Sequence, residues 1–537
     1  MSATPPVPPS RVAIVTLGCG RNEVDSEQLA GLFHRDGAVM VADPSTADVV
    51  LVNTCTFIAP AKQESIDTVL EACQLKDDGT ARAVLVVGCM AQRYPQELAD
   101  AIPEADAIVG FDGYARLPAI VEDVLAGRVT DRVIGAGEAH PGSRPLRRDL
   151  PLMITPSGSA SPADAPRADA RRTDDLVLGL SVAELPPEAP TPTGPVGTAQ
   201  DDLDRVPASG PRFPVRQLGA GAGPARPWAY LKIAAGCDRV CTFCAIPSFR
   251  GRFRSRPLDE VLGEAAWLAT QGVRELVLVS ENTTSWGKDL PGGRDLQPTL
   301  LRELSEVDGI DRIRLMYLQP AELSVSLLEA IAAEPKVATY YDLSLQHVSG
   351  PVVRRMARSG DHERFGQLIR RARDLDPDAV FRSNFIIGFP GETDHDVEVL
   401  ERFLEEHLLD WVGLFAFSRE DGTPSDDLPD QVDGGLAHER LLRVGDLQER
   451  LADAATRRFV GRSLDVLVEE HLDDGALTVG RSYREAPDTD GEVQLVTLDG
   501  TAADLPIGRM VTARVVDAVG VDLVAEVTAA TAGPRRD

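Results

Sequence analysis

The sequence contains no long hydrophobic run. No stretch approaches the roughly 18 uninterrupted apolar residues that a membrane-spanning helix needs. The first residues, MSATPPVPPS, also lack the basic segment and apolar core of a secretory signal. These absences argue against a membrane protein and a secreted one, so we expect a cytoplasmic protein with no membrane partner.

Cysteine and positive charge are both scarce. Seven cysteines in 537 residues are too few for a disulfide framework. Three of them are grouped, which in a cytoplasmic chain indicates metal binding or catalysis. Lys and Arg total 55 against 84 Asp and Glu, a formal net charge of -29. This field repels phosphate backbones and attracts basic proteins, so RNA binding is not expected to dominate.

The composition is otherwise that of a folded protein. Hydrophobic residues make up 43% of the chain and charged residues 26%, which excludes global disorder. A chain of 537 residues is longer than one hydrophobic core supports. We therefore expect an α/β protein with two to four domains.

Residues 11–135 alternate apolar strands with helical patterns and so predict a parallel α/β sheet. Cys19, Cys55 and Cys89 come at the ends of three of these strands. Because ligands of open α/β sheets bind at the carboxyl ends of strands, the three cysteines can converge there. Each alone would more often be a buried apolar residue. Cys73 lies within a helical pattern, and we expect it to pack in the core.

The rest of the chain divides into three parts. Residues 141–227 hold 16 of the 39 prolines with little periodicity, which is typical of a disordered insertion or linker. The apolar piece within it, 176–182, is either a docked segment or part of a loop. Residues 228–455 contain six candidate strands and predict a partial (β/α)6 barrel with its active site at the strand carboxyl ends. Residues 456–531 contain five short strands, the pattern of a small antiparallel β-barrel.

Three cysteines follow the first barrel strand with the spacing Cys237-x-x-x-Cys241-x-x-Cys244. Three thiolates on one loop can hold a 4Fe-4S cluster through three irons and leave the fourth iron open. The alternative is a zinc site, but zinc usually takes four ligands, and the sequence offers no fourth Cys or His nearby. The spacing therefore predicts a catalytic iron–sulfur cluster.

This spacing, Phe243 before the last cysteine and the six-strand region resemble the radical S-adenosylmethionine (SAM) superfamily. The resemblance implies that the open iron binds SAM, whose reductive cleavage gives a 5'-deoxyadenosyl radical. FIIGFPGE resembles the superfamily's element that contacts the adenine of SAM; its glycines permit close backbone approach and its proline fixes the turn. The cofactor-binding residues implied here are Gly388, Pro390, Gly391 and Glu392.

Position alone selects further candidates, three at the end of the second barrel strand, two at the end of the fourth and two within the fifth. Residues there line the active site of β/α barrels, although each is as easily a solvated rim residue. These candidates are Ser280, Glu281, Asn282, Gln346, His347, Arg382 and Ser383. Among them we expect Glu281 to bind the cofactor.

The N-terminal cysteines, the radical SAM module and the terminal barrel together resemble the methylthiotransferases, whose last unit is called a TRAM domain. The resemblance covers essentially the whole chain apart from 141–227. It implies two 4Fe-4S clusters, one that generates the radical and one that holds a sulfur species. The implied ligands are Cys237, Cys241 and Cys244 for the first and Cys19, Cys55 and Cys89 for the second.

Local signatures resemble the RimO type of methylthiotransferase more than the MiaB type. TLGCGRNEVDSE (16–27), VNTCTFI (52–58) and GRSYREAPDTDGEV (480–493) fit the RimO pattern. The RimO type modifies an aspartate of ribosomal protein uS12, and the MiaB type an adenosine of transfer RNA. Departures from the pattern are Gly20, Arg21 and the length of the proline-rich segment.

The charge of the terminal barrel supports the same choice independently. Residues 456–531 contain seven Arg or Lys against fourteen Asp or Glu. An RNA-binding barrel should be basic, and this balance suits a basic ribosomal protein, although a solvated acidic surface gives the same count. We expect methylthiolation of the β-carbon of a uS12 aspartate, which also needs an electron donor and a sulfur source. The alternative is a transfer RNA adenosine methylthiotransferase.

Overall fold

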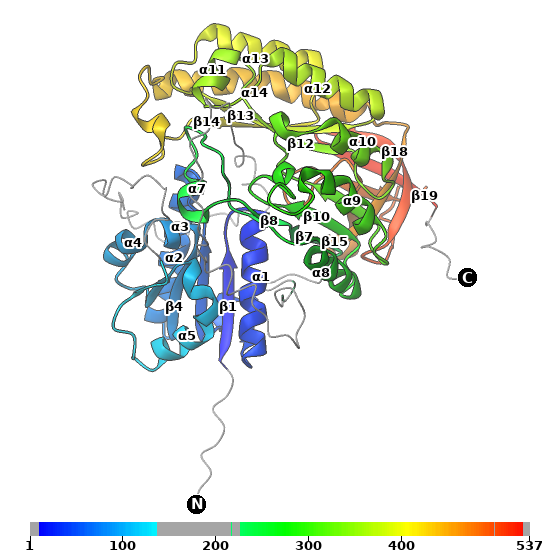
Figure 1. Cartoon of the computed structure of the whole chain (residues 1–537). Helices are drawn as coiled ribbons and strands as arrows, with labels where there is room; N and C mark the ends of the chain where they lie inside the picture. The colour runs from blue at the N-terminus through cyan, green and yellow to red at the C-terminus, as the bar shows by residue number, and fades with distance from the viewer. Residues whose placement is uncertain (1–9, 137–215, 217, 219–225, 499, 530–537) are drawn as a thin grey trace, which may run out of the picture.

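The computed structural model describes residues 10–136, 216, 218, 226–498 and 500–529. An N-terminal α/β domain, a central β/α domain and a C-terminal β-barrel pack against one another (Figure 1), as the sequence predicted. The segment 176–182 and most of the proline-rich region lie outside the described residues. Within the described ranges, no helix has the length and apolarity needed to cross a membrane.

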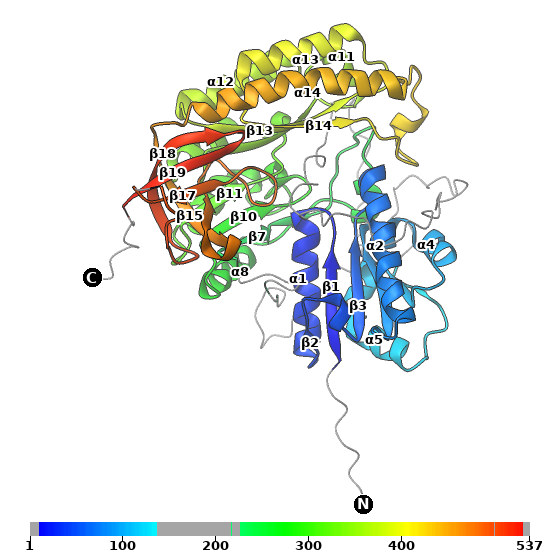
Figure 2. The ribbon, with the colours of Figure 1, turned by 180° about the vertical axis from the view of Figure 1, so that it is seen from behind.

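A six-stranded parallel sheet with the order β2-β1-β3-β4-β5-β6 forms the N-terminal domain. Its strands are β1 (Arg11–Thr16), β2 (Val39–Met40), β3 (Val49–Thr54), β4 (Ala83–Gly88), β5 (Ala107–Val109) and β6 (Val133–Ile134). Its helices are α1 (Gly20–Arg35), α2 (Ala59–Asp77), α3 (Cys89–Arg93), α4 (Pro95–Ala101) and α5 (Leu117–Leu125). Alternate side chains of β3 and β4 enter two separate apolar cores, which explains their unbroken hydrophobic runs. Neighbouring strands β1 and β3 end side by side (Figure 2).

The central domain contains the six predicted parallel strands. They are β7 (Trp228–Lys232), β10 (Glu275–Val279), β11 (Arg312–Leu315), β12 (Tyr340–Gln346), β13 (Val380–Ile387) and β14 (Trp411–Ala416). They form two three-stranded sheets, β11-β10-β7 and β12-β13-β14, which are joined by the isolated bridges Ile313–Val337 and Leu318–Leu343. The partial barrel is therefore open on one side, between β7 and β14.

Helices and short elements connect these strands. The helices are α7 (Ile246–Arg250), α8 (Leu258–Thr270), α9 (Gln297–Ser305), α10 (Val325–Ala333), α11 (Gly350–Arg355), α12 (His362–Leu375), α13 (Asp394–His407) and α14 (Gly434–Arg457), and the short strands are β8 (Ala234–Ala235) and β9 (Arg254–Ser255). Leu231 and Leu276 join the core formed with the surrounding helices. The alternate residues Tyr230 and Val277 join a second core that the C-terminal barrel shares.

The C-terminal domain is a closed barrel of five strands in the order β15-β16-β17-β19-β18. The strands are β15 (Ser463–Leu472), β16 (Leu477–Arg481), β17 (Val493–Val496), β18 (Met510–Val519) and β19 (Asp522–Ala529). Four pairings are antiparallel, but β17 and β19 run parallel. The prediction of an antiparallel barrel needs this correction, because an odd number of strands cannot alternate in direction all the way around a closed ring.

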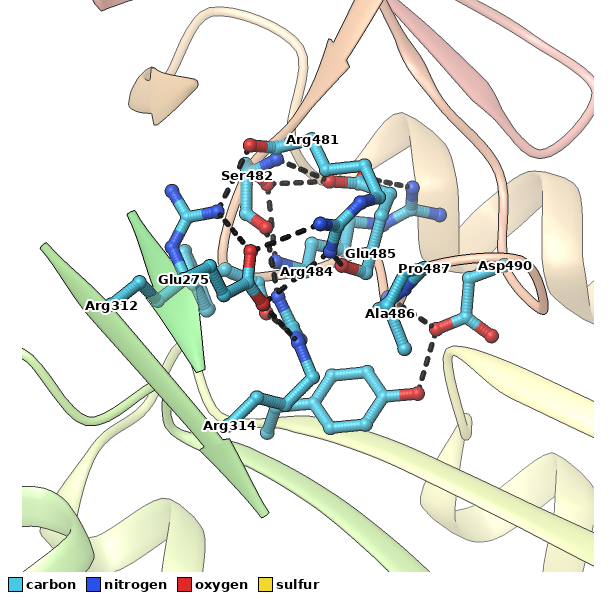
Figure 3. A network of polar contacts seen from close by, with 12 residues as sticks. Glu275, Arg312, Arg314, Arg481, Ser482, Arg484, Glu485, Ala486, Pro487 and Asp490 are labelled. Atoms are coloured by element: carbon cyan, nitrogen blue, oxygen red, sulfur yellow. Dashed lines mark hydrogen bonds and ion pairs between the residues drawn. The ribbon is translucent and has the colours of Figure 1, made fainter. Parts of the chain in front are cut away.

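The C-terminal barrel closes the amino end of the central barrel through buried charges (Figure 3). The carboxylate of Glu275, the first residue of β10, accepts from Arg314 Nε at 2.8 Å and lies 3.4 Å from Arg312 Nη1. Arg481 of β16 reaches the same carboxylate at 3.1 Å. Arg314 also donates to the carbonyl of Ser482. This end of the barrel is filled, so the carboxyl ends of the strands are left for a site.

Arg216 belongs to the proline-rich region but has a definite place in the fold. Its side chain is fully buried and pairs with Glu27 of α1 and, at 2.5 Å, with Glu264 of α8. The region was predicted to be a disordered insertion. At this residue the structure differs, because ion pairs to two domains hold the side chain between them.

Candidate functional site

Cys19, Cys55 and Cys89 lie together at the carboxyl edge of the N-terminal sheet. Cys19 is the N-cap of α1, Cys55 directly follows β3, and Cys89 opens α3 after β4. Gly18 precedes Cys19 with φ +92°, and a Cβ there would stand 3.0 Å from Cys55 Sγ. The turn therefore needs glycine. The structure brings these three distant cysteines together, as the strand order predicted.

Two arginines stand beside this trio of thiols. Nε of Arg21 donates to Cys19 Sγ at 3.4 Å, and Nη2 of Arg250 donates to Cys89 Sγ at 3.2 Å. Burial and the neighbouring thiols raise the pKa of Cys55 to about 12, and burial raises the pKa of Cys89. Burial also opposes ionisation of Cys19, but Arg21 and Arg250 outweigh it and lower its pKa. Positive charge is thus concentrated at one side of the trio.

Cys237, Cys241 and Cys244 lie on the loop between β8 and α7. The loop is held by its backbone, since Cys237 N donates to the Gly251 carbonyl at 3.1 Å and Cys244 N to the Cys241 carbonyl at 3.2 Å. Burial raises the pKa of Cys237 to about 12 and raises that of Cys241 as well. The hydrogen bond from the Cys241 thiol lowers the pKa of Cys244. These three thiols are therefore mutual neighbours.

Both trios have the donor chemistry of an iron–sulfur site, because thiolates are the usual protein ligands of such clusters. In the part of the chain that the structure describes, no group of three or more His, Cys, Asp or Glu side chains is arranged to hold a metal ion. The fit therefore rests on the thiol donors and on their mutual effects on pKa. Cys73 lies apart, on α2, where its side chain joins the apolar core of the N-terminal domain.

Unpaired polar atoms gather at the carboxyl ends of the barrel strands. Glu281 Oε2, both polar atoms of Gln346 and Asn384 Oδ1 are buried and lack a hydrogen-bond partner among the described residues. Gln346 also has φ +69°, in the left-handed region that residues other than glycine seldom adopt. Buried groups of this kind are costly unless a ligand satisfies them. Sequence reasoning missed Asn384, whose only signal was its place near a strand end.

Three other predicted residues form hydrogen bonds within the protein. Asn282 Nδ2 donates to Ser285 Oγ at 2.9 Å, and Ser383 Oγ donates to the Leu343 carbonyl at 2.7 Å. The hydroxyl of Ser280, the residue at the end of β10, likewise lies 3.3 Å from that of a neighbouring threonine. These contacts organise the strand ends and leave Glu281, Gln346 and His347 as the predicted residues with a buried polar atom that lacks a hydrogen-bond partner among the described residues.

Arg382 and His347 also have partners within the fold. Arg382 pairs with Asp490 of the C-terminal barrel. His347 Nδ1 accepts from the backbone N–H of Ser349 at 3.0 Å, and its Nε2 lies 3.5 Å from Glu392 Oε2. His347 follows the end of β12, whereas Arg382 lies within β13 and reaches the C-terminal barrel, so the contacts of both run to the protein itself.

Glu392 braces the FIIGFPGE turn. Its Oε2 accepts from the N–H of Gly388 at 2.9 Å, and its Oε1 accepts from Arg440 of α14 at 3.0 Å. Gly388 and Gly391 both have φ +80°, so the prediction that this turn requires glycine agrees with the backbone. Pro390 lies between them. The carboxylate of Glu392 is therefore committed to holding the turn.

An apolar cavity opens between the N-terminal and central domains, beside the loop that bears Cys237, Cys241 and Cys244. Phe243, Ile386 and Phe417 line it from the central domain, and Phe57 and Arg93 from the N-terminal domain. Ile386 belongs to the FIIGFPGE segment, and Phe243 immediately precedes Cys244. An aromatic, mostly apolar slot of this kind suits a flat heteroaromatic ring.

Three family models together match most of the chain. The Uncharacterized protein family UPF0004 matches residues 11–110, the Radical SAM superfamily 231–404 and the TRAM domain 460–528. Among solved structures, the radical S-adenosylmethionine methyltransferase TsrM of Kitasatospora setae is 16% identical, with a TM-score of 0.49. That match covers 78% of this chain and 75% of TsrM.

Curated relatives cover nearly the whole chain. The ribosomal protein uS12 methylthiotransferase RimO of Streptomyces griseus is 46% identical over 96% of this chain and 97% of its own. Its counterpart in Streptomyces coelicolor is 47% identical over 97% of both chains, and that of Kineococcus radiotolerans is 46% identical over 96% of both. The thiol trios, the open strand ends and these full-length matches lead to one conclusion: the chain belongs to the RimO family of ribosomal protein uS12 methylthiotransferases.

Proposed function

We propose that this protein methylthiolates the β-carbon of an aspartate in ribosomal protein uS12. Contacts between the two domains carry the proposal. Arg250, on α7 directly after the loop that bears Cys237, Cys241 and Cys244, donates to Cys89 Sγ at 3.2 Å, and Arg21 donates both to Cys19 Sγ and to the carbonyl of Ser280 after β10. Both trios therefore border the same buried region between two domains, which suits a reaction that needs a radical and a sulfur at one carbon.

The radical chemistry belongs to the central barrel. Cys237, Cys241 and Cys244 would hold a 4Fe-4S cluster, which together with SAM supplies a 5'-deoxyadenosyl radical when both are bound. The unpaired carboxylate oxygen of Glu281 would accept an N–H from the ammonium group of the methionine moiety, and Gln346 would offer further partners to that moiety. The aromatic cavity would exclude water around the adenine.

Ile386 is the residue of the FIIGFPGE segment that lines that cavity. Gly388, Pro390 and Gly391 would present their backbone to the adenine, and Glu392 holds the turn against α14. Because the Glu392 carboxylate already has two partners, we assign it a positioning role and Glu281 the direct polar contact.

The sulfur chemistry belongs to the N-terminal domain. Cys19, Cys55 and Cys89 would hold a second 4Fe-4S cluster, which supplies the sulfur that is inserted. Lys232 of β7 donates to Asp25 of α1 at 2.8 Å, a contact that ties this domain to the barrel. The two centres then meet only because the domains are docked.

The substrate is a basic ribosomal protein, and the net charge of -29 favours its approach. The relatives at 44–47% identity carry uS12 methylthiotransferase names, which supports uS12 over transfer RNA. An electron donor and a sulfur source are also required, and the reaction takes place in the cytoplasm. We propose the domain limits 11–135, 228–455 and 456–531, with 141–227 as an insertion.

The test uses anaerobically reconstituted full-length protein with SAM, sulfide, a reductant and either a uS12 loop peptide or intact small subunits. Mass spectrometry should find one added CH2S unit on aspartate. No gain on either uS12 substrate, together with a gain on transfer RNA, would overturn the proposal.

Single substitutions test whether the two cysteine trios have separate roles. Cys237→Ala should abolish both 5'-deoxyadenosine and product, whereas Cys19→Ala should remove product and spare some 5'-deoxyadenosine. Cys73→Ala, outside both trios, is the control and should keep both activities. Identical behaviour of Cys19→Ala and Cys237→Ala would contradict the division of labour.

A further inference from the structure

Tyr317 lies two residues beyond the carboxyl end of β11, in a backbone conformation that residues other than glycine seldom adopt. Its φ is +60°, in the left-handed region. Both of its backbone polar groups are held, because its N–H donates to Asp342 Oδ2 at 2.8 Å and its carbonyl accepts from the N–H of Thr283 at 3.3 Å. Conformations of this kind persist only where the surroundings fix them, and they gather at functional sites. The direction of the Tyr317 side chain is therefore set by β12 and by the segment after β10.

The ring of Tyr317 lies at the junction of the central and N-terminal domains. Arg21 of α1 stacks over this ring at 5.0 Å. The same guanidinium group donates to Cys19 Sγ at 3.4 Å and to the Ser280 carbonyl at 3.3 Å. Its Nε is 3.8 Å from Oε1 of Glu281, the residue proposed above to bind the methionine moiety of SAM. Through one arginine, Tyr317 is thus flanked by an N-terminal thiol on one side and by the cofactor residue on the other.

The hydroxyl of Tyr317 has no hydrogen-bond partner among the described residues, and the side chain is partly exposed. Phenol groups at such half-buried places usually have a partner. Burial, and after it the Cys19 thiol, raises the pKa of Tyr317, so the hydroxyl stays protonated at neutral pH and can donate. A donor left open in this way is suited to an acceptor that arrives with a ligand.

We propose that the Tyr317 hydroxyl binds the side-chain carboxylate of the substrate aspartate and thereby selects aspartate as the target. The β-carbon is bonded to that carboxylate. Under the proposed function, on which this inference rests, the β-carbon must lie within reach of both the SAM site and the N-terminal thiols, and Tyr317 stands between them. The Arg21 guanidinium over the ring adds positive charge beside the bound anion. A hydrogen bond to the carboxylate also fixes the direction of the adjacent C–H bonds.

The experiment measures substrate affinity apart from turnover. Reconstituted full-length protein is kept anaerobic with SAM and without reductant, and binding of a fluorescent uS12 loop peptide is followed by anisotropy. Tyr317→Phe should weaken binding about tenfold, the size expected for one hydrogen bond to a charged group. A second peptide carries asparagine in place of the target aspartate. Its affinity penalty should be about tenfold smaller in Tyr317→Phe than in the unaltered protein, because the two changes remove the same contact.

Tyr341→Phe is the matched control. The Tyr341 ring stacks on that of Phe381 at 5.3 Å in the core formed with the surrounding helices, and its buried hydroxyl also lacks a partner among the described residues. Loss of this hydroxyl should leave the affinity for both peptides unchanged. Iron content and SAM affinity, the latter by equilibrium dialysis, are measured in every variant. Both should equal those of the unaltered protein in Tyr317→Phe and in Tyr341→Phe.

An undiminished preference of Tyr317→Phe for the aspartate peptide would overturn the proposal. A loss of SAM affinity in place of peptide affinity would assign the hydroxyl to the cofactor and overturn it as well. Should Tyr317→Phe lose its iron, Tyr317→Asn takes its place with the same expected result, since asparagine tolerates the left-handed conformation.

Failure of the proposed function has a different signature. In that case the unaltered protein itself would show no preference for the aspartate peptide and would leave uS12 unmodified. If only the role of Tyr317 is wrong, the unaltered protein modifies the aspartate and Tyr317→Phe keeps the full preference for it.

Discussion

Individual residues at the strand ends separate structural polar groups from those left for a ligand. Asn282 and Ser383 donate hydrogen bonds to other groups of the protein. Glu281 does not, since its Oε2 is buried without a partner among the described residues. Polar residues on these strands thus differ in whether they have a partner within the protein, and only the contacts distinguish them.

The unpartnered carboxylate oxygen of Glu281 leads to a specific prediction. Glu281→Gln keeps the shape but removes the charge that receives the ammonium of SAM, so the KM for SAM should rise about tenfold. Steady-state 5'-deoxyadenosine formation measures the change, with iron content as the check on folding. A Ser280→Ala variant tests the neighbouring position, whose hydroxyl contacts only protein in the described structure. Equal KM values for Glu281→Gln and the unaltered protein would contradict the assignment.

At the scale of elements, short turns decide where the thiols stand. The loop bearing Cys237 follows Gly236, which has φ +76°, and a Cβ there would collide with the Arg252 carbonyl. At the N-terminal trio, Gly18 has φ +92°, and a Cβ there would stand 3.0 Å from the Cys55 side chain. Glycine at these two points leaves room for a backbone carbonyl in one case and for a ligand cysteine in the other.

Gly236→Ala should therefore lose the iron of the radical cluster. The added methyl group meets a backbone atom that cannot move aside, and the left-handed conformation adds roughly 1–2 kcal/mol of strain. Gly272→Ala is the matched control, because Gly272 also has a positive φ, +91°, but an added Cβ meets nothing within 4 Å. Iron analysis and 5'-deoxyadenosine formation should be impaired only in Gly236→Ala. Similar losses in both variants would mean that strain alone, not the contact with Arg252, is responsible.

At the scale of the whole molecule, the C-terminal barrel is built into the central domain. Burial alone would raise the pKa of Glu275, but Arg481, Arg314 and Arg312 outweigh it and lower that pKa to about 2. Arg481 belongs to the C-terminal barrel and the other two belong to β11. The stability of the joint is therefore electrostatic as well as apolar.

The pH dependence of this joint follows from the lowered pKa. Glu275 contributes stability that is complete above its unfolded value of 4.5 and is lost as the pH falls toward 2. Glu275→Gln should destabilise the protein by about 3 kcal/mol at neutral pH, and the difference from the unaltered protein should vanish near pH 2. Thermal melting at several pH values measures it. Glu303→Gln on the surface is the control; a constant gap across the pH range would contradict the prediction.

Removal of the C-terminal barrel is a stronger version of the same test. A chain ending at residue 455 exposes the inner apolar side of the barrel, including Tyr230 and Val277, and leaves Glu275 without Arg481. It should therefore fail to fold into a compact state, and the full-length protein should unfold its central and C-terminal domains in one calorimetric transition. Two separate transitions would show that the barrel is a tethered module instead.

The sequence by itself determined the elements and the ligand candidates of this protein. The spacing of the apolar residues and the length of each apolar run predicted the parallel sheet, the six barrel strands and the five short strands. This works because helices and strands each expose their side chains to the core at a fixed spacing along the chain. The spacing of Cys237, Cys241 and Cys244 was a local signal on one loop. The prediction that Cys19 and Cys55 lie together needed only the rule that parallel strands end at the same edge of a sheet.

The tertiary structure alone decided which side chains meet. Nothing local brings Arg250 to Cys89, or sets Asp490 against Arg382, since the partners in each pair come from different domains. The parallel pairing of β17 with β19 follows from closing five strands into a ring, which no strand pattern contains. Contacts between distant segments depend on how the folded domains dock. Sequence periodicity describes only which face of each helix or strand is apolar.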